Sequence, residues 1–329
     1  MQKSILVTGG AGYIGSHVCK ALKKYGYNPI AYDNLCSGNR SAVKWGPFIE
    51  GDIRDQNTLS EVILKYYPMA IMHFAALIQV AESVKNPSLF YNNNVYGSFC
   101  LLETARQHNI KNMIFSSTAA VYGLPNISPI SEDVIKKPIN PYGQTKLMME
   151  QMIYDYSKAY GLNYAVLRYF NAAGADPEGE IGTAYKVDTH IIPLLMRVAG
   201  NLTEQIKVFG TDYDTPDGTA IRDYIHVTDL AEAHILALEH IISGKESIIL
   251  NIGTNKGLSV SDVIKTVRYV TGHAIPEFLG DRRLGDPPIL IADATKAKDI
   301  LNWAPKYSDI ETIIKTAWGW NQTQNKNKL

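Results

Sequence analysis

Short apolar runs alternate with amphipathic stretches along the first half of the chain. The runs rich in β-branched residues predict six strands: Ser4–Thr8, Asn28–Tyr32, Phe48–Glu50, Ala70–Phe74, Asn112–Ser116 and Asn163–Tyr169. Apolar positions at helical spacing between them predict helices at Ser16–Lys24, Thr58–Tyr66, Leu89–His108 and Pro141–Tyr160. Strands that alternate with helices form βαβ units, so we expect an α/β fold with a doubly wound parallel sheet covered on both faces.

After Asn171 the regular alternation ends and glycine and proline interrupt long connections. Helical spacing returns at Ile191–Ala199, Thr228–Ile242, Ser259–Thr271 and Ile310–Trp320, and we expect the polar tail after Trp320 to be frayed. We therefore predict a dinucleotide-binding domain over residues 1–171. Residues 172–329 should form mainly a smaller, partly discontinuous substrate domain, with some segments returning to the first domain.

Composition limits the partners that the chain can have. Apolar residues make up 46% of the 329 residues, and 32 basic residues balance 32 acidic ones. Without net charge there is no field to attract nucleic acid or an acidic membrane, so we expect neither partner. Cys19, Cys36 and Cys100 are isolated and lack metal-ligand spacing. They indicate reduced thiols in a cytoplasmic protein without a metal site.

A glycine-rich turn follows the first predicted strand. Gly9, Gly12 and Gly15 are spaced three apart, with Tyr13 and Ile14 before the last of them. Glycines there permit a tight turn and let backbone N–H groups approach a diphosphate at the start of a helix. The spacing alone also suits a strand–helix turn without a ligand. In this strand–turn–helix context it predicts a Rossmann-type dinucleotide site.

Two carboxylates end the next strands. Asp33 stands where an acid can accept from both ribose hydroxyls and repel a 2′-phosphate, which favours NAD over NADP. As part of Asp33-Asn34 it could also be a turn residue. Asp52 could equally meet the adenine or cap a turn, and spacing does not decide between the two.

Tyr142 and Lys146 stand four positions apart at the start of a predicted helix, on one face of it. A free phenol has a pKa of about 10 and is a poor base at neutral pH. A neighbouring ammonium and a positive nicotinamide ring would favour the phenolate. This spacing alone is common at surfaces. The Tyr-Lys pair becomes more specific beside the glycine turn and the hydroxyls of Ser116, Ser117 and Thr118. These hydroxyls follow the fifth predicted strand and should face the same crevice as the glycine turn, unless they only cap the strand end.

These motifs together resemble the extended short-chain dehydrogenase/reductase family and, within it, the UDP-glucose 4-epimerase group. The resemblance spans nearly the whole chain. It is carried by the runs Thr8–Gly15, Asp33–Gly38, His73–Ala76, Asn92–Val95, Tyr169–Asn171, Arg222–Val227 and Arg282–Asp286.

The resemblance implies a role for each matching residue. Tyr142 would be the acid/base, Lys146 its partner on the nicotinamide ribose, and Thr118 the hydroxyl that bonds the sugar 4-oxygen. The implied cofactor contacts, those of the glycine turn included, are Gly9, Gly12, Tyr13, Ile14, Gly15, Asp33, Asn34, Asp52, Ile53, Phe74, Ala75, Ala76, Asn93, Tyr142, Lys146 and Phe170. The implied substrate contacts are Thr118, Tyr142, Asn171, His190, Arg222, Arg283 and Asp286. An arginine suits a diphosphate because its planar fork donates in pairs, although a surface ion pair would equally explain either one.

The implied reaction oxidises the sugar at C4 to a transient 4-ketone, with NAD bound throughout, and reduces it on the other face. Anchoring the UDP while the sugar turns is the physical requirement. The chain departs from the family at Ile78, where many relatives carry Lys, at His190, where others carry Asn, and at Leu290, where some carry a large Tyr. Ile78 could weaken the hold on NAD. Leu290 leaves acceptance of N-acetylated hexoses open.

Three other functions compete with this hypothesis. A 4-epimerase acting on another UDP-sugar, such as a UDP-pentose or UDP-uronate, is the main alternative. Nucleotide-sugar dehydratases and decarboxylases carry acidic groups after the catalytic Thr, where this chain has Ala119 and Ala120. A non-catalytic dinucleotide sensor would not need Tyr142 and Lys146. Relatives also pair through the Leu89–His108 and Pro141–Tyr160 helices, which implies a homodimer, although core packing would equally explain their apolar residues.

Overall fold

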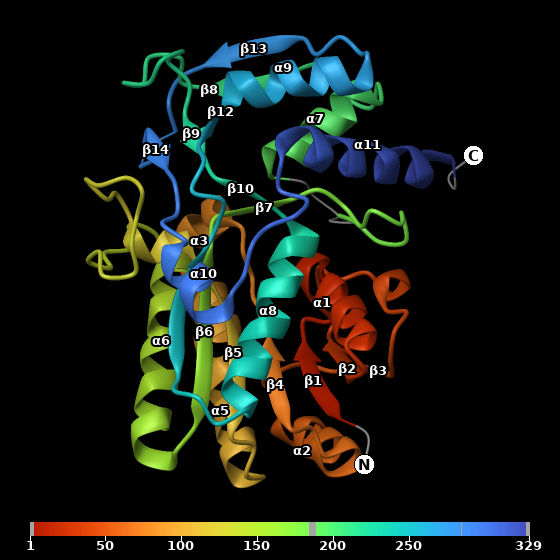
Figure 1. Ribbon diagram of the computed structural model, residues 1–329, viewed down its shortest axis with the longest axis vertical. Helices are drawn as coiled ribbons and strands as arrows, with labels where there is room; N and C mark the ends of the chain where they lie inside the picture. The colour runs from red at the N-terminus through yellow and green to blue at the C-terminus, as the bar shows by residue number, and fades with distance from the viewer. Residues whose placement is uncertain (1–2, 184–188, 284, 327–329) are drawn as a thin grey trace.

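A parallel sheet forms the centre of the protein. The structure is a computed structural model that describes residues 3–183, 189–283 and 285–326 (Figure 1). Leu284, which lies in the Arg282–Asp286 run named above, falls outside the described residues. The seven-stranded sheet has the order β11-β6-β5-β4-β1-β2-β3. Its strands are β1 (Ser4–Thr8), β2 (Asn28–Asp33), β3 (Phe48–Glu50), β4 (Ala70–His73), β5 (Asn112–Thr118), β6 (Asn163–Tyr169) and β11 (Ile248–Ile252).

The sheet confirms the predicted α/β class. Every paired neighbour in it runs parallel. All residues of β1, β2 and β4 are buried, as expected for strands covered on both faces. The chain builds outward from β1 to β3 and then returns to β4, on the other side of β1. The strand order therefore reverses at β1 and β4, and ligands bind at such a switch point beyond the carboxyl ends of the strands.

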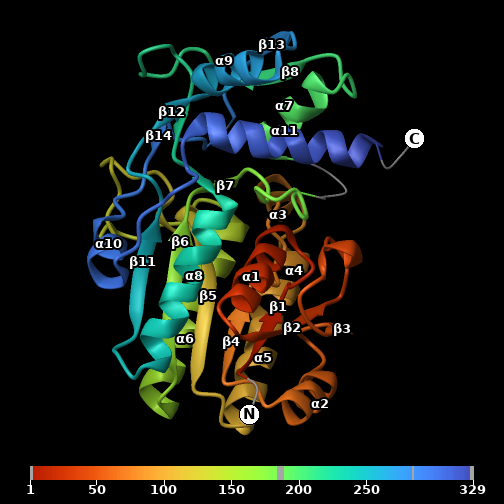
Figure 2. The same ribbon diagram turned by 45° about the vertical axis from the view of Figure 1, so that its right-hand side comes forward.

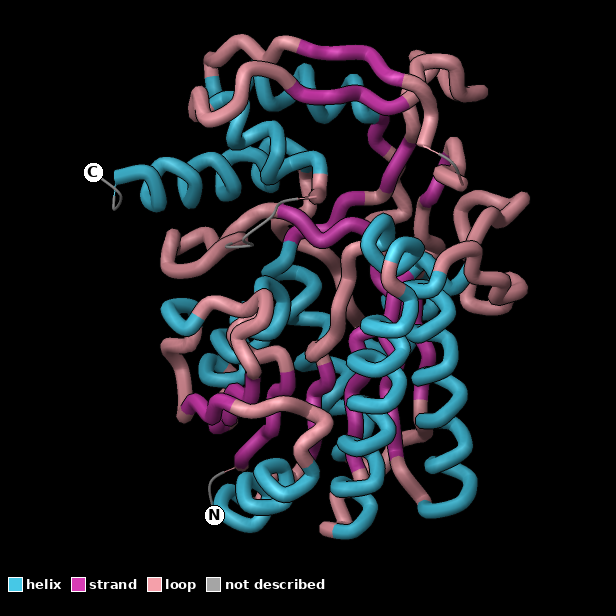
Figure 3. The backbone as a smooth tube through the Cα atoms, turned by 180° about the vertical axis from the view of Figure 1, so that it is seen from behind, coloured by secondary structure: helices cyan, strands magenta, loops and turns pink. Residues whose placement is uncertain are grey.

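Helices cover both faces of the sheet (Figures 1 and 3). One layer packs its apolar residues with the sheet into a first core and consists of α1 (Tyr13–Lys24), α8 (Val227–Ile242) and α10 (Thr295–Leu301). The opposite layer forms a second core with α2 (Gln56–Tyr66), α5 (Gly97–Gln107) and α6 (Pro141–Tyr160). Smaller helical pieces near the carboxyl edge are Arg40–Ala42, α3 (Val80–Lys85), α4 (Pro87–Phe90) and Ala119–Tyr122.

The single helix predicted over Leu89–His108 is wrong. The segment contains α4, a π-helical stretch at Tyr91–Tyr96 and then α5. Single π-helical turns inside α-helices are frequent at functional sites. Asn94 lies in this turn, where its side-chain oxygen accepts from the Leu77 nitrogen at 2.8 Å and its side-chain nitrogen donates to the Leu77 carbonyl at 3.0 Å. The apolar spacing alone did not reveal this interruption.

A second unit lies above the carboxyl edge of the sheet (Figure 2). Its apolar core joins α7 (Ile191–Ala199), α9 (Val260–Thr271) and α11 (Ile310–Lys326). Its short strands are β7 (Asn171–Ala173), β8 (Ile206–Phe209), β9 (Ile221–Arg222), β10 (Tyr224–His226), β12 (Leu258–Ser259), β13 (Glu277–Gly280) and β14 (Ile289–Leu290). The expected frayed tail after Trp320 is wrong, because α11 continues to Lys326.

Segments from the second half of the chain also complete the lower unit. Strand β11 pairs with β6 at the edge of the large sheet, and α8 packs against α1, β5 and β6. The sequence analysis missed β11. The boundary at residues 171 and 172 stays a prediction. No helix of the described part of the chain is both long and apolar enough to cross a bilayer.

Candidate active site

The glycine turn lies where β1 meets α1, which begins at Tyr13 and not at Ser16 as predicted. Gly9 has a φ of +75°, and a Cβ on it would lie 2.6 Å from the backbone nitrogen of Ala75. A Cβ at Gly15 would lie 2.2 Å from the carbonyl oxygen of Gly9. Both positions therefore require glycine for the close approach of backbone to backbone. The buried start of α1 directs its free N–H groups toward the space above the turn.

Asp33 stands beside this turn and is almost fully buried. One carboxylate oxygen accepts from the backbone nitrogen of Ala11 at 3.0 Å, and the other accepts from that of Leu35 at 2.8 Å. Burial raises the pKa of Asp33, and these two hydrogen bonds oppose the rise. The carboxylate is thus fixed in direction next to the turn.

A pocket of about 260 Å³ opens above the turn, and we call it the glycine-loop pocket. The predicted cofactor contacts that line it are Gly9, Gly12, Tyr13, Ile14, Gly15, Asp33, Asn34, Ile53, Phe74, Ala75, Ala76, Asn93, Tyr142 and Lys146. Phe170 lines the neighbouring pocket instead. The predicted contacts that line the glycine-loop pocket thus come from six separate stretches of sequence.

Asp52 is not among the residues that line the glycine-loop pocket. Its carboxylate accepts from the backbone and the guanidinium of Arg54, at 2.9 and 2.7 Å, and from the side chain of Asn34 at 3.0 Å. The Arg54 side chain holds the pKa of Asp52 far below its usual range. The structure therefore contains the turn cap, and a contact of Asp52 with adenine stays a prediction.

Tyr142 and Lys146 lie on the first turns of α6, which Asn140 caps by accepting from the Gly143 nitrogen at 2.8 Å. The Lys146 ammonium donates to the carbonyl of Ser116 at 2.8 Å and lies 4.9 Å from the centre of the Phe115 ring. The Tyr142 hydroxyl and Thr118 share a hydrogen bond. A phenol, a hydroxyl and an ammonium are thus brought together at the end of β5.

Burial dominates the electrostatics of this group. It raises the pKa of Tyr142 to about 12, and the Thr118 hydrogen bond acts against the rise. Burial also lowers the pKa of Lys146 to about 7, opposed by the negative charge of Glu150. The side chains of the protein therefore do not by themselves bring the pKa of the phenol to neutral pH, and the expectation called for the positive nicotinamide ring as well as the ammonium. A further positive charge near Tyr142 would be needed to favour its phenolate.

The three hydroxyls after the fifth strand do not all face one crevice. Thr118 lines the larger pocket described below, and Ser116 lines the glycine-loop pocket. Ser117 is turned away and donates to the buried Glu150 at 2.5 Å. The expectation for Ser117 is therefore wrong, because successive side chains on a strand point to opposite faces.

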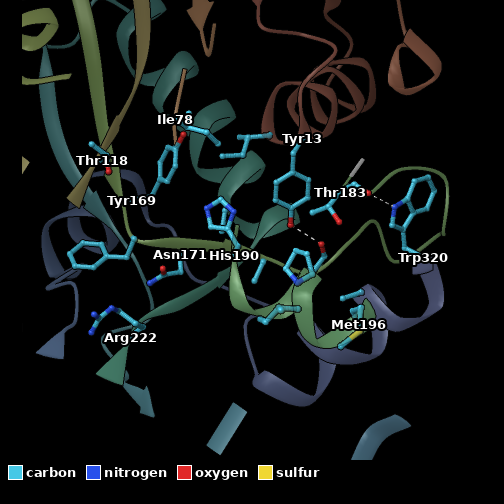
Figure 4. Close-up of a pocket in the computed structure, with 18 of the residues that line it drawn as sticks. Tyr13, Ile78, Thr118, Tyr169, Asn171, Thr183, His190, Met196, Arg222 and Trp320 are labelled. Atoms are coloured by element: carbon cyan, nitrogen blue, oxygen red, sulfur yellow. Dashed lines mark hydrogen bonds between the residues drawn. The ribbon is translucent and has the colours of Figure 1, made fainter. Parts of the chain in front are cut away.

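A second cavity of about 540 Å³ lies between the sheet edge and the upper unit, and we call it the upper pocket (Figure 4). The predicted substrate contacts Thr118, Tyr142, Asn171, His190 and Arg222 line it. The two pockets share lining residues, namely Tyr13, Ile14, Ile78, Tyr142, Tyr169 and His190. The predicted acid/base thus lies at the junction of a cofactor-shaped and a substrate-sized cavity.

The predicted anion-binding residues are placed unequally. Arg222 donates to Asp286 at 2.5 Å, so these two form one unit at the wall of the upper pocket. Arg283 lies with its guanidinium 3.9 Å from the centre of the Phe209 ring and does not line the pocket. Arg222 thus lines the pocket itself, Asp286 contacts it through Arg222, and Arg283 is stacked on Phe209 outside the pocket lining.

Sequence reasoning missed several residues of this site. Tyr169 lines both pockets and shares a very short hydrogen bond with Ser116. Trp320 and Met196 line the far end of the upper pocket (Figure 4). The position of Tyr169 at the carboxyl end of a strand was an available signal. The sequence held no such signal for the pocket contacts from α7 and α11, because those helices reach the site only through the tertiary fold.

An acidic cluster lies outside both pockets. Asp176, Glu178 and Glu180 have carboxylate oxygens close enough together to suit a metal ion. The Lys20 ammonium lies 2.8, 2.8 and 2.6 Å from these three carboxylates, so it already supplies a positive charge to them. The cluster is satisfied as an ion-pair network.

Fold and site together define a dinucleotide-dependent enzyme, with a nucleotide pocket and a substrate pocket that share one Tyr-Lys pair. The model of the NAD dependent epimerase/dehydratase family matches residues 5–253. The chain belongs to this family. It uses NAD as its cofactor, as the glycine turn and Asp33 had indicated.

Individual relatives are similar over nearly the whole length. The UDP-glucose 4-epimerase of Rhizobium leguminosarum bv. trifolii is 49% identical over 326 residues, which are 99% of either chain. The crystal structure of the Brucella ovis UDP-glucose 4-epimerase in complex with NAD has a TM-score of 0.94 and 49% identity, over 96% of this chain and 97% of that one. The Bifidobacterium longum enzyme in complex with NAD+ and UDP has a TM-score of 0.93 and 38% identity, over 99% and 100%.

Proposed function

We propose that the protein is a UDP-glucose 4-epimerase, which interconverts UDP-glucose and UDP-galactose and keeps its NAD throughout. The observation that carries the proposal is the position of Tyr142, which touches Thr118 and lines both pockets. A group at that junction can reach a sugar hydroxyl and a cofactor ring together. The full-length relatives that carry this enzyme's name support the choice of substrate.

The glycine-loop pocket fits a dinucleotide. The backbone at Gly9 and Gly15 leaves no room for a Cβ, as needed where a diphosphate meets the start of a helix. The fixed carboxylate of Asp33 can accept from ribose hydroxyls. Asn34, Ile53 and the Phe74–Ala76 segment would enclose the remaining cofactor surface. When bound there, NAD supplies reversible oxidation of the sugar carbon.

The chain's own residues would handle the proton. Tyr142 would take the proton of the 4-hydroxyl while Thr118 bonds the same oxygen, and it would return that proton after the sugar has turned. Lys146 would hold a positive charge close to the phenol, which favours the phenolate that accepts a proton. The Ser116 carbonyl fixes the Lys146 ammonium in this position.

The upper pocket would anchor the nucleotide and leave the sugar free. Arg222, supported by Asp286, can bind the diphosphate, and Asn171 and His190 line the same cavity. We assign Arg283 to the UDP as well, because the resemblance implies it; its guanidinium lies against the Phe209 ring. Binding energy from the nucleotide can then retain the sugar while its ring reorients, which inversion at C4 requires.

Alternative chemistry receives less support from the same cavity. Ala119 and Ala120 line the upper pocket beside Thr118, where an elimination would need an acid/base side chain. A 4-epimerase of a larger UDP-sugar is the main alternative, because Leu290, a smaller side chain than the Tyr of some relatives, lines the pocket. Ile78 lines both pockets and brings no charge to the nicotinamide side.

A homodimer is also part of the proposal. Helices α5 and α6 pack side by side, and they expose Phe99 on α5 and Met148 and Tyr154 on α6; Tyr96, just before α5, is exposed as well. Exposed aromatic and methionine side chains of this kind suit an isologous interface. Light scattering should give a mass of twice the 36.5 kDa of one chain, and Phe99→Asp should reduce the measured mass to that of one chain. Tyr269→Asp, on an exposed part of α9, is the matched control.

We assign the protein to the cytoplasm. Cys19 and Cys100 are buried free thiols and Cys36 is an exposed one. Free thiols suit a reducing compartment.

The test incubates purified protein separately with UDP-glucose and UDP-N-acetylglucosamine and identifies products by anion-exchange chromatography and proton NMR. UDP-galactose from the first substrate is the expected product. Turnover of the second would show that Leu290 leaves space for an N-acetyl group. A 4-keto-6-deoxy sugar, or no product from UDP-glucose, would contradict the proposal.

A further inference from the structure

A buried ion pair lies directly beneath the Tyr142–Lys146 group. Glu150 stands one helical turn after Lys146 on α6 and is 7% exposed. Arg168 on β6, 2% exposed, donates to both of its carboxylate oxygens, at 2.9 and 2.6 Å. Arg168 also donates to the hydroxyl of Tyr122 at 2.9 Å. Removing two charges from water is costly, so such a pair requires a reason beyond packing.

The pair is connected to the predicted catalytic group by two routes. The first is mechanical: Glu150 accepts from Ser117 at 2.5 Å, and Ser117 directly follows Ser116, whose carbonyl accepts from the Lys146 ammonium. The second is electrostatic. Lys146 and Glu150 lie on one face of α6, and the carboxylate raises the pKa of Lys146 against the lowering effect of burial.

The other titratable groups around Lys146 do not replace this charge. Tyr142 lies one turn before it on α6 and is neutral at ordinary pH in the protein itself. His73 on β4 is buried, and burial followed by the Lys146 charge lowers its pKa to about 3, so it is neutral as well. Arg168 on β6 is positive and is separated from Lys146 by Glu150. Glu150 is thus the anion that acts on Lys146.

We propose that Glu150 is a positioning residue for the epimerisation: it holds the Lys146 ammonium against the Ser116 carbonyl and keeps it charged. Arg168 orients Glu150 through its two parallel hydrogen bonds. The inference rests on the proposed function, because it assigns Lys146 to the reaction. A protein with an apolar pair at these two positions could fold as well, and the pKa of its Lys146 would be lower than in this protein.

The experiment measures kcat and KM against pH for the wild type, Glu150→Gln and Glu150→Asp with UDP-galactose, and the NAD content and melting temperature of each preparation. Without the carboxylate the pKa of Lys146 falls. As the pH rises, Lys146 therefore loses its charge, and the protein its activity, at a lower pH than in the wild type. We expect Glu150→Gln to lower kcat at pH 7 at least about fivefold, because a pKa one unit lower leaves about a tenth of Lys146 charged. The basic limb of its kcat profile should move at least one pH unit downward. Glu150→Asp should keep the limb within half a unit of the wild type.

Two further variants keep the test decisive. Glu150→Gln combined with Arg168→Met leaves no unpaired buried charge. This double variant therefore tests the role of the Glu150 charge even where the single variant fails to fold. The basic limb of its kcat profile should also lie at least one pH unit below that of the wild type. Asp176→Asn removes another buried carboxylate, 2.8 Å from Lys20, and should change kcat less than twofold. A folded, NAD-loaded Glu150→Gln or double variant with a wild-type basic limb would overturn the inference. An inactive wild type would instead refute the proposed function.

Discussion

The sharpest prediction concerns the glycine turn, where Gly15→Ala adds one methyl group. That Cβ would lie 2.2 Å from the carbonyl oxygen of Gly9 and 2.9 Å from its carbonyl carbon. Ordinary contact begins at 3.4 Å, so the backbone has to move by about 1 Å. The turn has little freedom to move, because Gly9 itself is pressed against the backbone of Phe74 and Ala75.

The cost can be estimated in two parts. Overpacking of a close backbone contact costs about 1–3 kcal/mol of stability. Displaced N–H groups would lose a charged hydrogen bond to the diphosphate, which contributes about 1.5–3 kcal/mol. Because the turn can relax when NAD is absent, both costs fall on the NAD-bound state, and together they weaken NAD binding by about 10²–10⁴-fold. We therefore expect Gly15→Ala to purify with little or no NAD.

The assay is the NAD released per chain on denaturation, with the melting temperature measured before and after NAD is added. Gly319→Ala on α11 is the matched control, because its Cβ meets nothing within 4 Å and alanine favours a helix. A Gly15→Ala protein that retains one NAD per chain and epimerises like the wild type would refute the reasoning.

Three further predictions test other parts of the site. Tyr142→Phe should lower kcat about 10³-fold with KM little changed, since it removes the proton acceptor, and initial rates within tenfold of the wild type would contradict that role. Arg222→Met should raise KM for UDP-glucose about 10–100-fold with kcat less affected, since a charged hydrogen bond to the diphosphate is lost; an unchanged KM would place the diphosphate elsewhere. Acid should destabilise the fold below about pH 6.5. Burial holds four histidines neutral, with pKa values near 3 or 4 in the folded protein. Between pH 6.5 and 4 the unfolded chain therefore binds more protons than the folded protein, and the free energy of unfolding falls as the pH falls. Urea unfolding at pH 7 and pH 5 measures this, and equal stabilities would contradict it; the residues are His17, His73, His226 and His234.

The order of strands and helices in the first half could be predicted from sequence because each element has its own period. Strands β1, β3 and β6 and helix α6 have the predicted bounds. Strand β11 was missed because a short apolar run after a helix has no periodic signal of its own and is fixed only by pairing with β6. The π-helical turn was missed because it is stabilised by Asn94, whose partners lie far away in sequence.

The candidate site shows the same division. Glycine spacing and the Tyr142–Lys146 pair are local patterns, so the sequence could locate them. The turn cap at Asp52 and the ion pair between Arg222 and Asp286 depend on which neighbour lies within reach, and composition cannot reveal that. The pairing of Glu150 with Arg168 joins a helix to a strand across the second core and was invisible in the same way.

The central claim is that one bound NAD removes and returns the same hydrogen at C4 of the sugar. The most direct test supplies UDP-glucose deuterated at C4 to the purified protein without added NAD and locates the label in the product by NMR. The account predicts UDP-galactose that retains deuterium at C4. Loss of the label to water, or conversion that needs added NAD, would contradict it.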